Sequence, residues 1–214
     1  MILKVLPLGP FQANCFILAD KATRQAAVID PGDEPEKILR AARGLEVKVI
    51  LLTHGHLDHV SGARRLKEET GAPLLIHAAD RELYEGLRDQ YAAAPGMFGL
   101  SLGPGHDPLP PDGTLEDGQE VAFGPRRLRV LHTPGHTPGC CCLLGEGILF
   151  SGDTLFFDGV GRTDLAGGDE KKLRASLQHR LMVLPSETRV FPGHGPFTTI
   201  EREKKTNPFM RAAR

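Results

Sequence analysis

Four side chains that commonly bind metal ions occupy the six positions from His54 to His59: His54, His56, Asp58 and His59. Imidazole nitrogens and carboxylate oxygens are the usual protein ligands of zinc, iron and manganese. On a locally extended chain His54 and His56 point the same way, whereas the neighbours Asp58 and His59 point in different directions. One metal ion could hardly bind all four, but two adjacent ions could bind two each. We therefore predict a metal site here; the alternative is a solvated loop that happens to be rich in histidine.

The elements on either side explain how this cluster could be positioned. Residues 47–52 form an apolar run rich in β-branched side chains, which predicts a buried strand. Residues 60–70 predict a helix that is closed by Gly71 and followed by Pro73. The cluster thus lies where a central strand ends and a helix begins. In open α/β sheets ligands bind at that carboxyl edge.

Three later stretches carry the same residue types just past predicted strands. Glycine or proline brackets each stretch, and such rigid loops suit a metal site. The stretches are 132–139, 151–154 and 192–196, and they contain His132, His136, Asp153 and His194.

Composition excludes several classes of protein. The 214 residues, 40% hydrophobic and 25% charged, suit one soluble globular domain over 1–214 with an ample core. With a formal net charge of −1 and no long charged run, neither nucleic acid nor an anionic membrane is expected as a partner. No apolar stretch approaches the roughly 20 residues of a membrane helix, and the N-terminus lacks a signal-peptide layout. Cys15 and the run 140–142 match no zinc-ribbon spacing, which favours buried residues of a cytoplasmic protein over a redox role.

The remaining pattern predicts two similar halves, each with a sheet that packs on its partner and on helices. The Gly/Pro-rich stretch 90–117 shows no such pattern, and we interpret it either as an active-site rim or as a connector. The predicted strands are 2–8, 14–19, 26–30, 47–52, 74–77, 119–123, 127–132, 140–144, 147–151 and 189–191, and the predicted helices are 34–43, 60–70, 79–87, 169–183 and one from Ile200.

In these motifs the chain resembles the metallo-β-lactamase superfamily, whose hallmark H-x-H-x-D-H precedes a later His, Asp and His. Within it the chain is most similar to the glyoxalase II-type hydrolases, and the similarity covers nearly the whole chain. The resemblance implies an α/β fold, a four-layer αβ/βα sandwich with a two-metal centre between the inner sheet edges. Since the chain ends at Arg214, it looks like the shorter members, without the C-terminal segment that helps hold glutathione. The stretches that carry the similarity are 53–59, 132–139, 151–156, 161–164 and 207–211.

The resemblance also implies the roles of single residues. Asp58 would be a catalytic residue as well as a ligand. Asp153 stands where one class of antibiotic-degrading enzymes has cysteine, which argues against β-lactam hydrolysis as the main role. An all-nitrogen-and-oxygen site accepts several metals, of which we expect zinc, with iron or manganese as alternatives. One ion would be bound by His54, His56 and His136, the other by Asp58, His59 and His194, and Asp153 would bridge both.

A thioester is the substrate class that suits such a site. A water that bridges two divalent ions loses its proton near neutral pH, and the resulting hydroxide can attack a carbonyl carbon. A thiolate leaves without help from a strong general acid, because a thiol has a pKa near ~8.5. The expected partner is therefore a small-molecule thioester, such as S-lactoylglutathione or another conjugate of glutathione or a similar thiol.

Three other functions stay open at this point. A persulfide dioxygenase, whose family shares the fold and the stretch 161–164, would use one iron bound by His54, His136 and Asp153. The near-neutral charge speaks against a nuclease of the same superfamily. The intact ligand set speaks against a scaffold that holds metal without catalysis.

Outside the ligand set, Arg162 is the candidate for a forked contact with a substrate carboxylate. The alternative is that Arg162 pairs with Asp164 or Asp169 and holds its own loop. The other histidines are expected in structural or exposed places: His132 and His77 in support of the fold or the ligands, and His106 and His179 in solvent.

Overall fold

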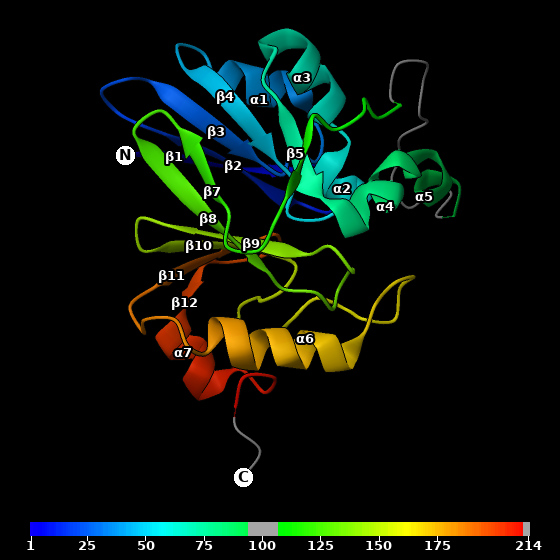
Figure 1. Ribbon diagram of the computed structural model, residues 1–214, viewed down its shortest axis with the longest axis vertical. Helices are drawn as coiled ribbons and strands as arrows, with labels where there is room; N and C mark the ends of the chain where they lie inside the picture. Colours follow the sequence, from blue (N-terminus) through cyan, green and yellow to red (C-terminus); the bar gives the residue numbers. More distant parts are fainter. Residues whose placement is uncertain (94–106, 212–214) are drawn as a thin grey trace.

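Two six-stranded sheets pack face to face in the computed structural model, which describes residues 1–93 and 107–211 (Figure 1). The first sheet has the order β1-β2-β3-β4-β5-β6, and the second has the order β12-β11-β10-β9-β8-β7. Their strands are β1 (Ile2–Leu8), β2 (Ala13–Ala19), β3 (Gln25–Ile29), β4 (Glu46–Leu51), β5 (Leu74–His77), β6 (Gly113–Leu115), β7 (Glu120–Phe123), β8 (Arg126–His132), β9 (Cys141–Gly145), β10 (Ile148–Gly152), β11 (Arg189–Pro192) and β12 (Thr198–Thr199).

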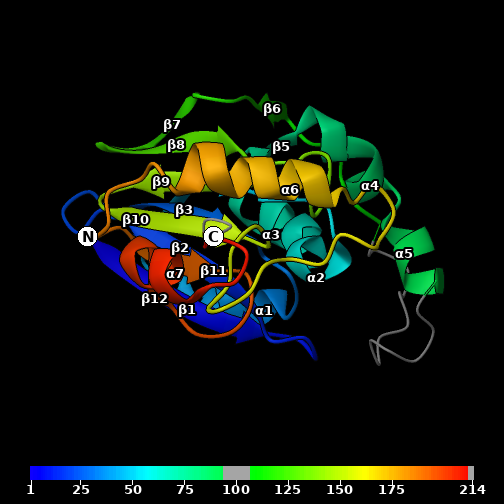
Figure 2. The same cartoon turned by 90° about the horizontal axis from the view of Figure 1, so that it is seen from below.

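Helices cover the outer face of each sheet, so the molecule has four layers (Figure 1). Seen from below, α6 and α7 lie across the second sheet (Figure 2). This arrangement confirms the predicted αβ/βα sandwich. The helices are α1 (Pro35–Ala41), α2 (Leu57–Val60), α3 (Ala63–Thr70), α4 (Arg81–Glu85), α5 (Leu87–Ala93), α6 (Glu170–Ser176) and α7 (Ile200–Thr206), with short helical turns at Ala78–Asp80 and Leu177–Leu181.

Central strands are apolar on both faces because each separates two cores. In β2, Cys15 and Ile17 face the helices, whereas Phe16 and Leu18 face the other sheet. In β10, Phe150 lies between the sheets and its neighbour Leu149 packs toward α6. Side chains alternate along a strand, so such positions appear in the sequence as continuous apolar runs.

Both sheets are mixed. β1, β2 and β3 pair antiparallel, and β3 to β6 pair parallel. In the second sheet β7 to β10 pair antiparallel, and β11 joins β10 in parallel. Parallel neighbours end at the same edge of their sheet. The loop after β4 lies at that edge of the first sheet, and the loops after β10 and β11 lie at that edge of the second.

Helix boundaries are where the predictions are wrong. The predicted helix 60–70 is divided between α2 and α3, because the Gly62 amide donates to Pro31 O (2.8 Å) and leaves the helical ladder. The predicted helix 79–87 stops at Gly86 and resumes as α5, where Gln90 bonds to Gly55 O (3.0 Å) and Leu57 N (3.0 Å). A tertiary hydrogen bond thus accounts for the interruption at Gly62, and Gln90 fixes α5 against the loop that carries Gly55.

Two short strands were missed. β6 lies inside the stretch 90–117, for which no regular structure was expected, and pairs with β5; β12 pairs with β11. Strands of two or three residues carry no periodic signal. Residues 94–106 of that stretch, with His106, lie outside the described residues, so the prediction of an active-site rim stays a prediction. Among the residues that are described, no helix is long and apolar enough to cross a membrane.

Replacing Phe150 tests the packing between the sheets. Phe150 is fully buried, with ring centroids 4.9 Å from Phe16 and 5.8 Å from Phe191. We expect Phe150→Ala to lower the free energy of unfolding by about 3–5 kcal/mol in urea titrations, because it leaves a cavity between the sheets. The control Val183→Ala, at a side chain that is 71% exposed, should change it by less than about 0.5 kcal/mol. Equal effects of the two substitutions would contradict this view of the core.

Candidate metal centre

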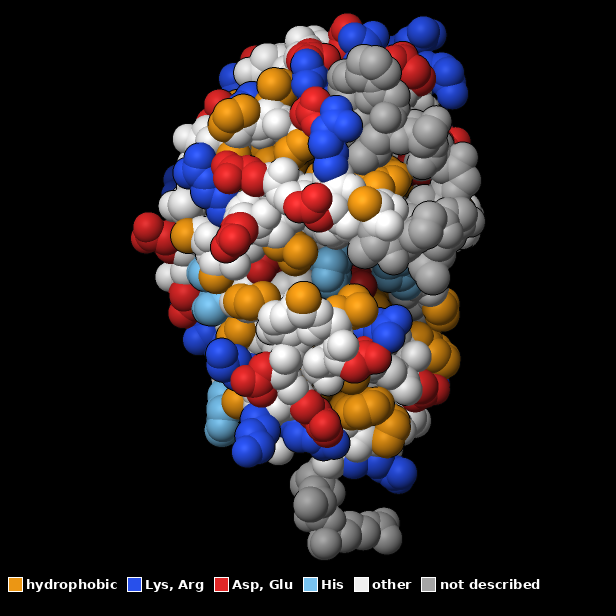
Figure 3. All heavy atoms as spheres, turned by 90° about the vertical axis from the view of Figure 1, so that its right-hand side faces the viewer, with side chains coloured by type: hydrophobic (Ala, Val, Ile, Leu, Met, Phe, Trp, Pro, Cys, Tyr) orange, Lys and Arg blue, Asp and Glu red, His pale blue; other side chains and the backbone are white. Residues whose placement is uncertain are grey.

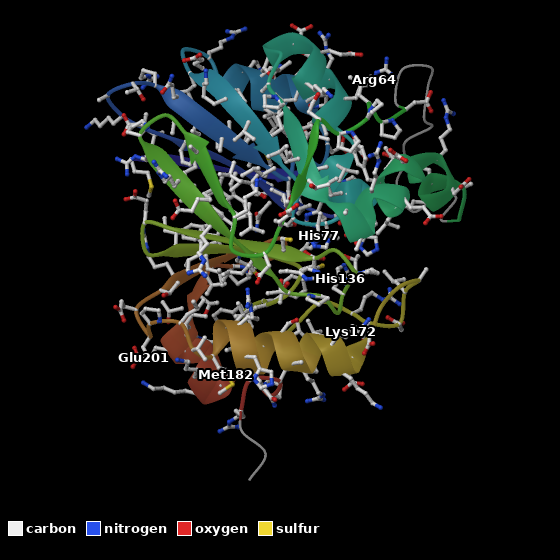
Figure 4. The ribbon with its side chains drawn as sticks, viewed as in Figure 1. Arg64, His77, His136, Lys172, Met182 and Glu201 are labelled. Atoms are coloured by element: carbon white, nitrogen blue, oxygen red, sulfur yellow. The ribbon has the colours of Figure 1, made fainter. Side chains whose placement is uncertain are left out.

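The polar stretches that follow β4, β8, β10 and β11 meet at one edge of the sandwich. In Figure 3 histidine side chains and a carboxylate lie at the seam between the two halves. Figure 4 shows His136 at this junction, on the loop after β8. The structure brings together all seven side chains that were predicted as ligands: His54, His56, Asp58, His59, His136, Asp153 and His194.

Six of these side chains form two groups of three. In the first group, made by His54, His56 and His136, the potential ligand atoms lie within 4.8 Å of one another, and His56 Nδ1 is 2.8 Å from His136 Nε2. The second group has the same compactness and is made by Asp58, His59 and His194. There His194 Nε2 is 3.1 Å from Asp58 Oδ2 and 3.2 Å from His59 Nε2. These are the residues that the resemblance assigns to the two ions, and their role as ligands stays a prediction.

Asp153 lies between the two groups. Its Oδ2 is 3.5 Å from His136 Nε2 and 3.7 Å from His194 Nε2, and its Oδ1 is 3.4 Å from His59 Nε2. A single carboxylate therefore faces one member of the first group and two of the second. This is the position that a bridging ligand would need.

Hydrogen bonds on the outer side of the rings fix which nitrogen faces the centre. A ring whose Nδ1–H donates outward keeps an unprotonated Nε2 for the centre. Asp30 Oδ2 lies 3.0 Å from His59 Nδ1, Arg162 O lies 2.7 Å from His136 Nδ1 and Phe11 O lies 3.1 Å from His194 Nδ1.

His54 is oriented through a relay. The Thr53 hydroxyl donates to Asp30 Oδ2 (2.6 Å), so its oxygen is free to accept from His54 Nδ1 at 3.1 Å. The Thr53 amide also donates to Asp30 (2.7 Å). The buried Asp30 carboxylate thus orients His59 directly and His54 through Thr53.

These residues fit a divalent cation. His54 Nε2 and Asp153 Oδ1 are buried and have no hydrogen-bond partner within the described part of the chain. Buried polar atoms without partners are costly. The Nε2 atoms of His59 and His194 lie 3.2 Å apart, close enough to share one cation. Cations at this point would satisfy every one of these atoms.

Charges in the centre favour the same conclusion. Burial and the neighbouring histidines hold the pKa of His54 well below its usual value, and burial and His136 lower the pKa of His56 to about 3. Burial also acts to lower the pKa of His59, but Asp153, Asp58 and Asp30 outweigh it and raise that pKa to about 10. His54 and His56 therefore offer neutral imidazoles, while the carboxylates around His59 favour a positive charge there.

Two buried carboxylates that support the site were not predicted. Asp30 lies at the end of the predicted strand 26–30, and a place at a strand end is also what indicated Asp153. Asp30 was not considered because it lies in no stretch with the spacing of metal ligands. Asp80 lies in the helical turn Ala78–Asp80, where no strand-end motif could have revealed it.

The other predicted residues lie around the centre without entering it. His132 Nε2 donates to Pro138 O (2.9 Å), and its ring stacks on His77 at 4.0 Å, so both have the structural role that was expected. His179 is exposed, as predicted. The Arg162 guanidinium is exposed and pairs with both oxygens of Asp164, each at 2.6 Å, which is the alternative left open for it.

The cysteines show no sign of reactivity. Cys15, Cys140, Cys141 and Cys142 are buried and free, and burial raises the pKa of each thiol. Thiolates are the reactive form, so these side chains act as small core residues.

A family model described as the metallo-beta-lactamase superfamily matches residues 8–194. The chain belongs to this superfamily. A relative from Haemophilus influenzae, named hydroxyacylglutathione hydrolase GloC, is 37% identical over 218 residues and is covered, like this chain, to 99%. This relative supports the resemblance to glyoxalase II. Family membership and the His-rich centre together support divalent metal binding and a metal-dependent hydrolase.

Solved structures share the fold over nearly the whole chain. The B3 metallo-beta-lactamase BLEG-1 has a TM-score of 0.88 at 34% identity and covers 99% of this chain and 100% of its own. The protein TTHA1623 in a di-iron-bound form has a TM-score of 0.84 at 44% identity, with 96% and 99% covered. ETHE1 from Myxococcus xanthus has a TM-score of 0.79 at 30% identity, with 97% and 84% covered.

Gly193 tests how tightly the centre is packed. A Cβ atom at this position would lie 2.2 Å from Asp153 Oδ1 and 2.7 Å from His59 Cε1. We expect Gly193→Ala to displace both side chains and to weaken Zn²⁺ binding to the metal-free protein by about 10-fold or more, measured by calorimetric titration. Gly159→Ala is the matched control, because its Cβ would meet nothing closer than 3.9 Å. Unchanged Zn²⁺ binding in Gly193→Ala would show that these two side chains do not hold the ion.

Proposed function

We propose that the protein is a thioester hydrolase of the glyoxalase II type that uses two divalent metal ions. The observation that carries the proposal is the pair of ligand groups with Asp153 between them. His54, His56 and His136 would hold one ion, Asp58, His59 and His194 the other, and Asp153 would bridge both. Zinc is the expected metal; the di-iron form of TTHA1623 makes iron the alternative to test.

When bound, a pair of divalent ions supplies a water of near-neutral pKa and a positive charge that polarises a carbonyl. The chain's own residues supply the rest. Asp58 is the group placed to orient an attacking water, because its carboxylate is 21% exposed and lines a pocket with Phe11, Leu57 and Tyr91. The relative named hydroxyacylglutathione hydrolase GloC supports a thioester as the substrate.

A thiolate leaving group suits this site, which has no side chain reserved as a general acid. All seven converging side chains are histidines or carboxylates that we assign to the metals, so none is reserved as a general acid. A thiolate needs none, because thiols ionise near pH ~8.5. The buried free thiols are consistent with a reducing compartment, so the proposal places the enzyme in the cytoplasm.

A persulfide dioxygenase is the second candidate, and the likeness to ETHE1 favours it. One iron would then be bound by His54, His136 and Asp153, and His136 Nε2 does lie 3.5 Å from Asp153 Oδ2. This candidate would leave the compact group of Asp58, His59 and His194 without a function. We therefore favour the hydrolase.

The deciding experiment combines metal analysis with a substrate panel. We expect purified protein to hold two ions per chain and to cleave S-lactoylglutathione or a related thioester. Chelation should lower the rate by about 100-fold or more, and added Zn²⁺ should restore it. One bound iron with oxygen uptake on glutathione persulfide would instead establish the dioxygenase. A β-lactam belongs in the panel because BLEG-1 is described as a B3 metallo-beta-lactamase; cleavage of the β-lactam alone would overturn the proposal.

Arg162 tests recognition of the substrate. In the proposal its guanidinium exchanges Asp164 for a substrate carboxylate, which is feasible because both side chains are more than 60% exposed. We expect Arg162→Ala to raise KM for S-lactoylglutathione about 10-fold with little change in kcat. KM for an uncharged N-acetylcysteamine thioester should not change.

Arg127→Ala is the control for this prediction, since Arg127 of β8 forms a similar exposed pair with Glu120 of β7. If Arg162→Ala and Arg127→Ala leave KM equally unaffected, Arg162 only holds its own loop.

A further inference from the structure

Asp80 is a fully buried carboxylate that accepts three hydrogen bonds. Its Oδ2 accepts from the Gly55 amide (3.0 Å) and from the Thr137 hydroxyl (2.6 Å), and its Oδ1 accepts from the Gly139 amide (2.6 Å). Both oxygens are therefore engaged: Oδ2 bonds both loops, and Oδ1 bonds the loop that carries Thr137 and Gly139. Among the described residues, the side chain forms no hydrogen bond with an imidazole.

The three donors lie beside the ligands of one group. Gly55 stands between His54 and His56, and Thr137 directly follows His136. The first loop extends from β4 of one sheet, and the second extends from β8 of the other. Asp80 thus connects the two halves of the sandwich at the point where the three histidines of the first group must meet.

Close packing leaves this carboxylate little freedom. A Cβ atom at Gly139 would lie 2.7 Å from Asp80 Cβ, and one at Gly55 would lie 2.9 Å from Asp80 O. The helical turn Ala78–Asp80 that carries Asp80 directly follows β5, and His77 Nδ1 caps it by accepting from the Ala79 amide (3.2 Å). A small displacement of Asp80 would therefore move both histidine loops.

The second group has other supports. Asp30 contacts His59 directly, and Phe11 O accepts from His194. Asp30 reaches the first group only through Thr53 and His54. Asp30 therefore contacts a ligand of the second group directly, whereas Asp80 bonds the loops that carry the first group.

We propose that Asp80 is a positioning residue that sets the affinity for the ion held by His54, His56 and His136, and leaves the affinity of the other site unchanged. The inference rests on the ligand set proposed above. An asparagine at position 80 keeps the shape but has one acceptor oxygen. In either orientation its NH₂ group would face at least one donor of the loop after β8, either the Gly139 amide or the Thr137 hydroxyl. That loop would then shift, and the three nitrogens would lose their spacing.

The test is a calorimetric titration of the metal-free full-length chain with Zn²⁺. Wild type should show two binding steps. In Asp80→Asn one step should weaken by about 10- to 100-fold while the other keeps its wild-type affinity. The split between steps is the decisive readout, because a general loss of stability would weaken both.

Asp20→Asn is the matched control. Asp20 is also buried and accepts from two amides, those of Ala22 and Thr23, and from the Thr23 hydroxyl, but it bonds Arg126 and no histidine loop. It should lower the melting temperature as Asp80→Asn does and leave both Zn²⁺ steps intact. If Asp80→Asn does not fold, Thr137→Val, which removes one donor to Asp80, should weaken the same step.

The outcomes separate the two proposals. A wild-type chain that takes up fewer than two Zn²⁺ ions would overturn the ligand set and this inference with it. Two wild-type steps that persist unchanged in Asp80→Asn or in Thr137→Val would overturn this inference alone. So would an equal loss of one step in Asp20→Asn.

Discussion

The structure depends on a cluster of imidazole nitrogens and carboxylate oxygens that cannot satisfy one another. Within the described residues, His54 Nε2 and Asp153 Oδ1 are buried without hydrogen-bond partners. Folding alone gives no reason to assemble such atoms, because unpaired buried polar groups destabilise a protein. Cations would explain the arrangement, because they would satisfy these atoms. The outer hydrogen bonds of the rings, to Asp30 and to two carbonyl groups, then have a clear purpose.

The sandwich is the means by which the chain assembles this cluster. The stretches that follow β4, β8, β10 and β11 are far apart in sequence, and each is short and rigid. Packing of Phe16, Phe150 and Phe191 fixes one sheet on the other, so the edges of both sheets are aligned. Because Gly193 has no side chain, the loop after β11 packs directly against Asp153 and His59, which completes the alignment. The packing between the sheets therefore also sets the geometry of the site.

The sequence predicts the features that neighbouring residues determine, and misses those that depend on contacts between distant residues. The buried strands appear as apolar runs, and the seven candidate ligands each lie just past such a run, so their convergence could be expected. The interruption at Gly62 could not, because it depends on a hydrogen bond to Pro31. Strand β6 forms only because β5 offers its edge. Asp80 was missed for the same reason, since its three donors are distant in sequence and nothing near it suggests a site.

The support of the two ligand groups is unequal, and this bears on the chemistry. The first group consists of imidazoles from both halves of the sandwich, joined through Asp80. The second contains Asp58 and has Asp30 behind His59, so it carries more negative charge. An ion in the second group would therefore be the more strongly neutralised of the two. In the proposed hydrolase, a carbonyl oxygen that gains negative charge during attack would be better stabilised beside His54, His56 and His136, and Asp58 would lie on the side of the attacking water.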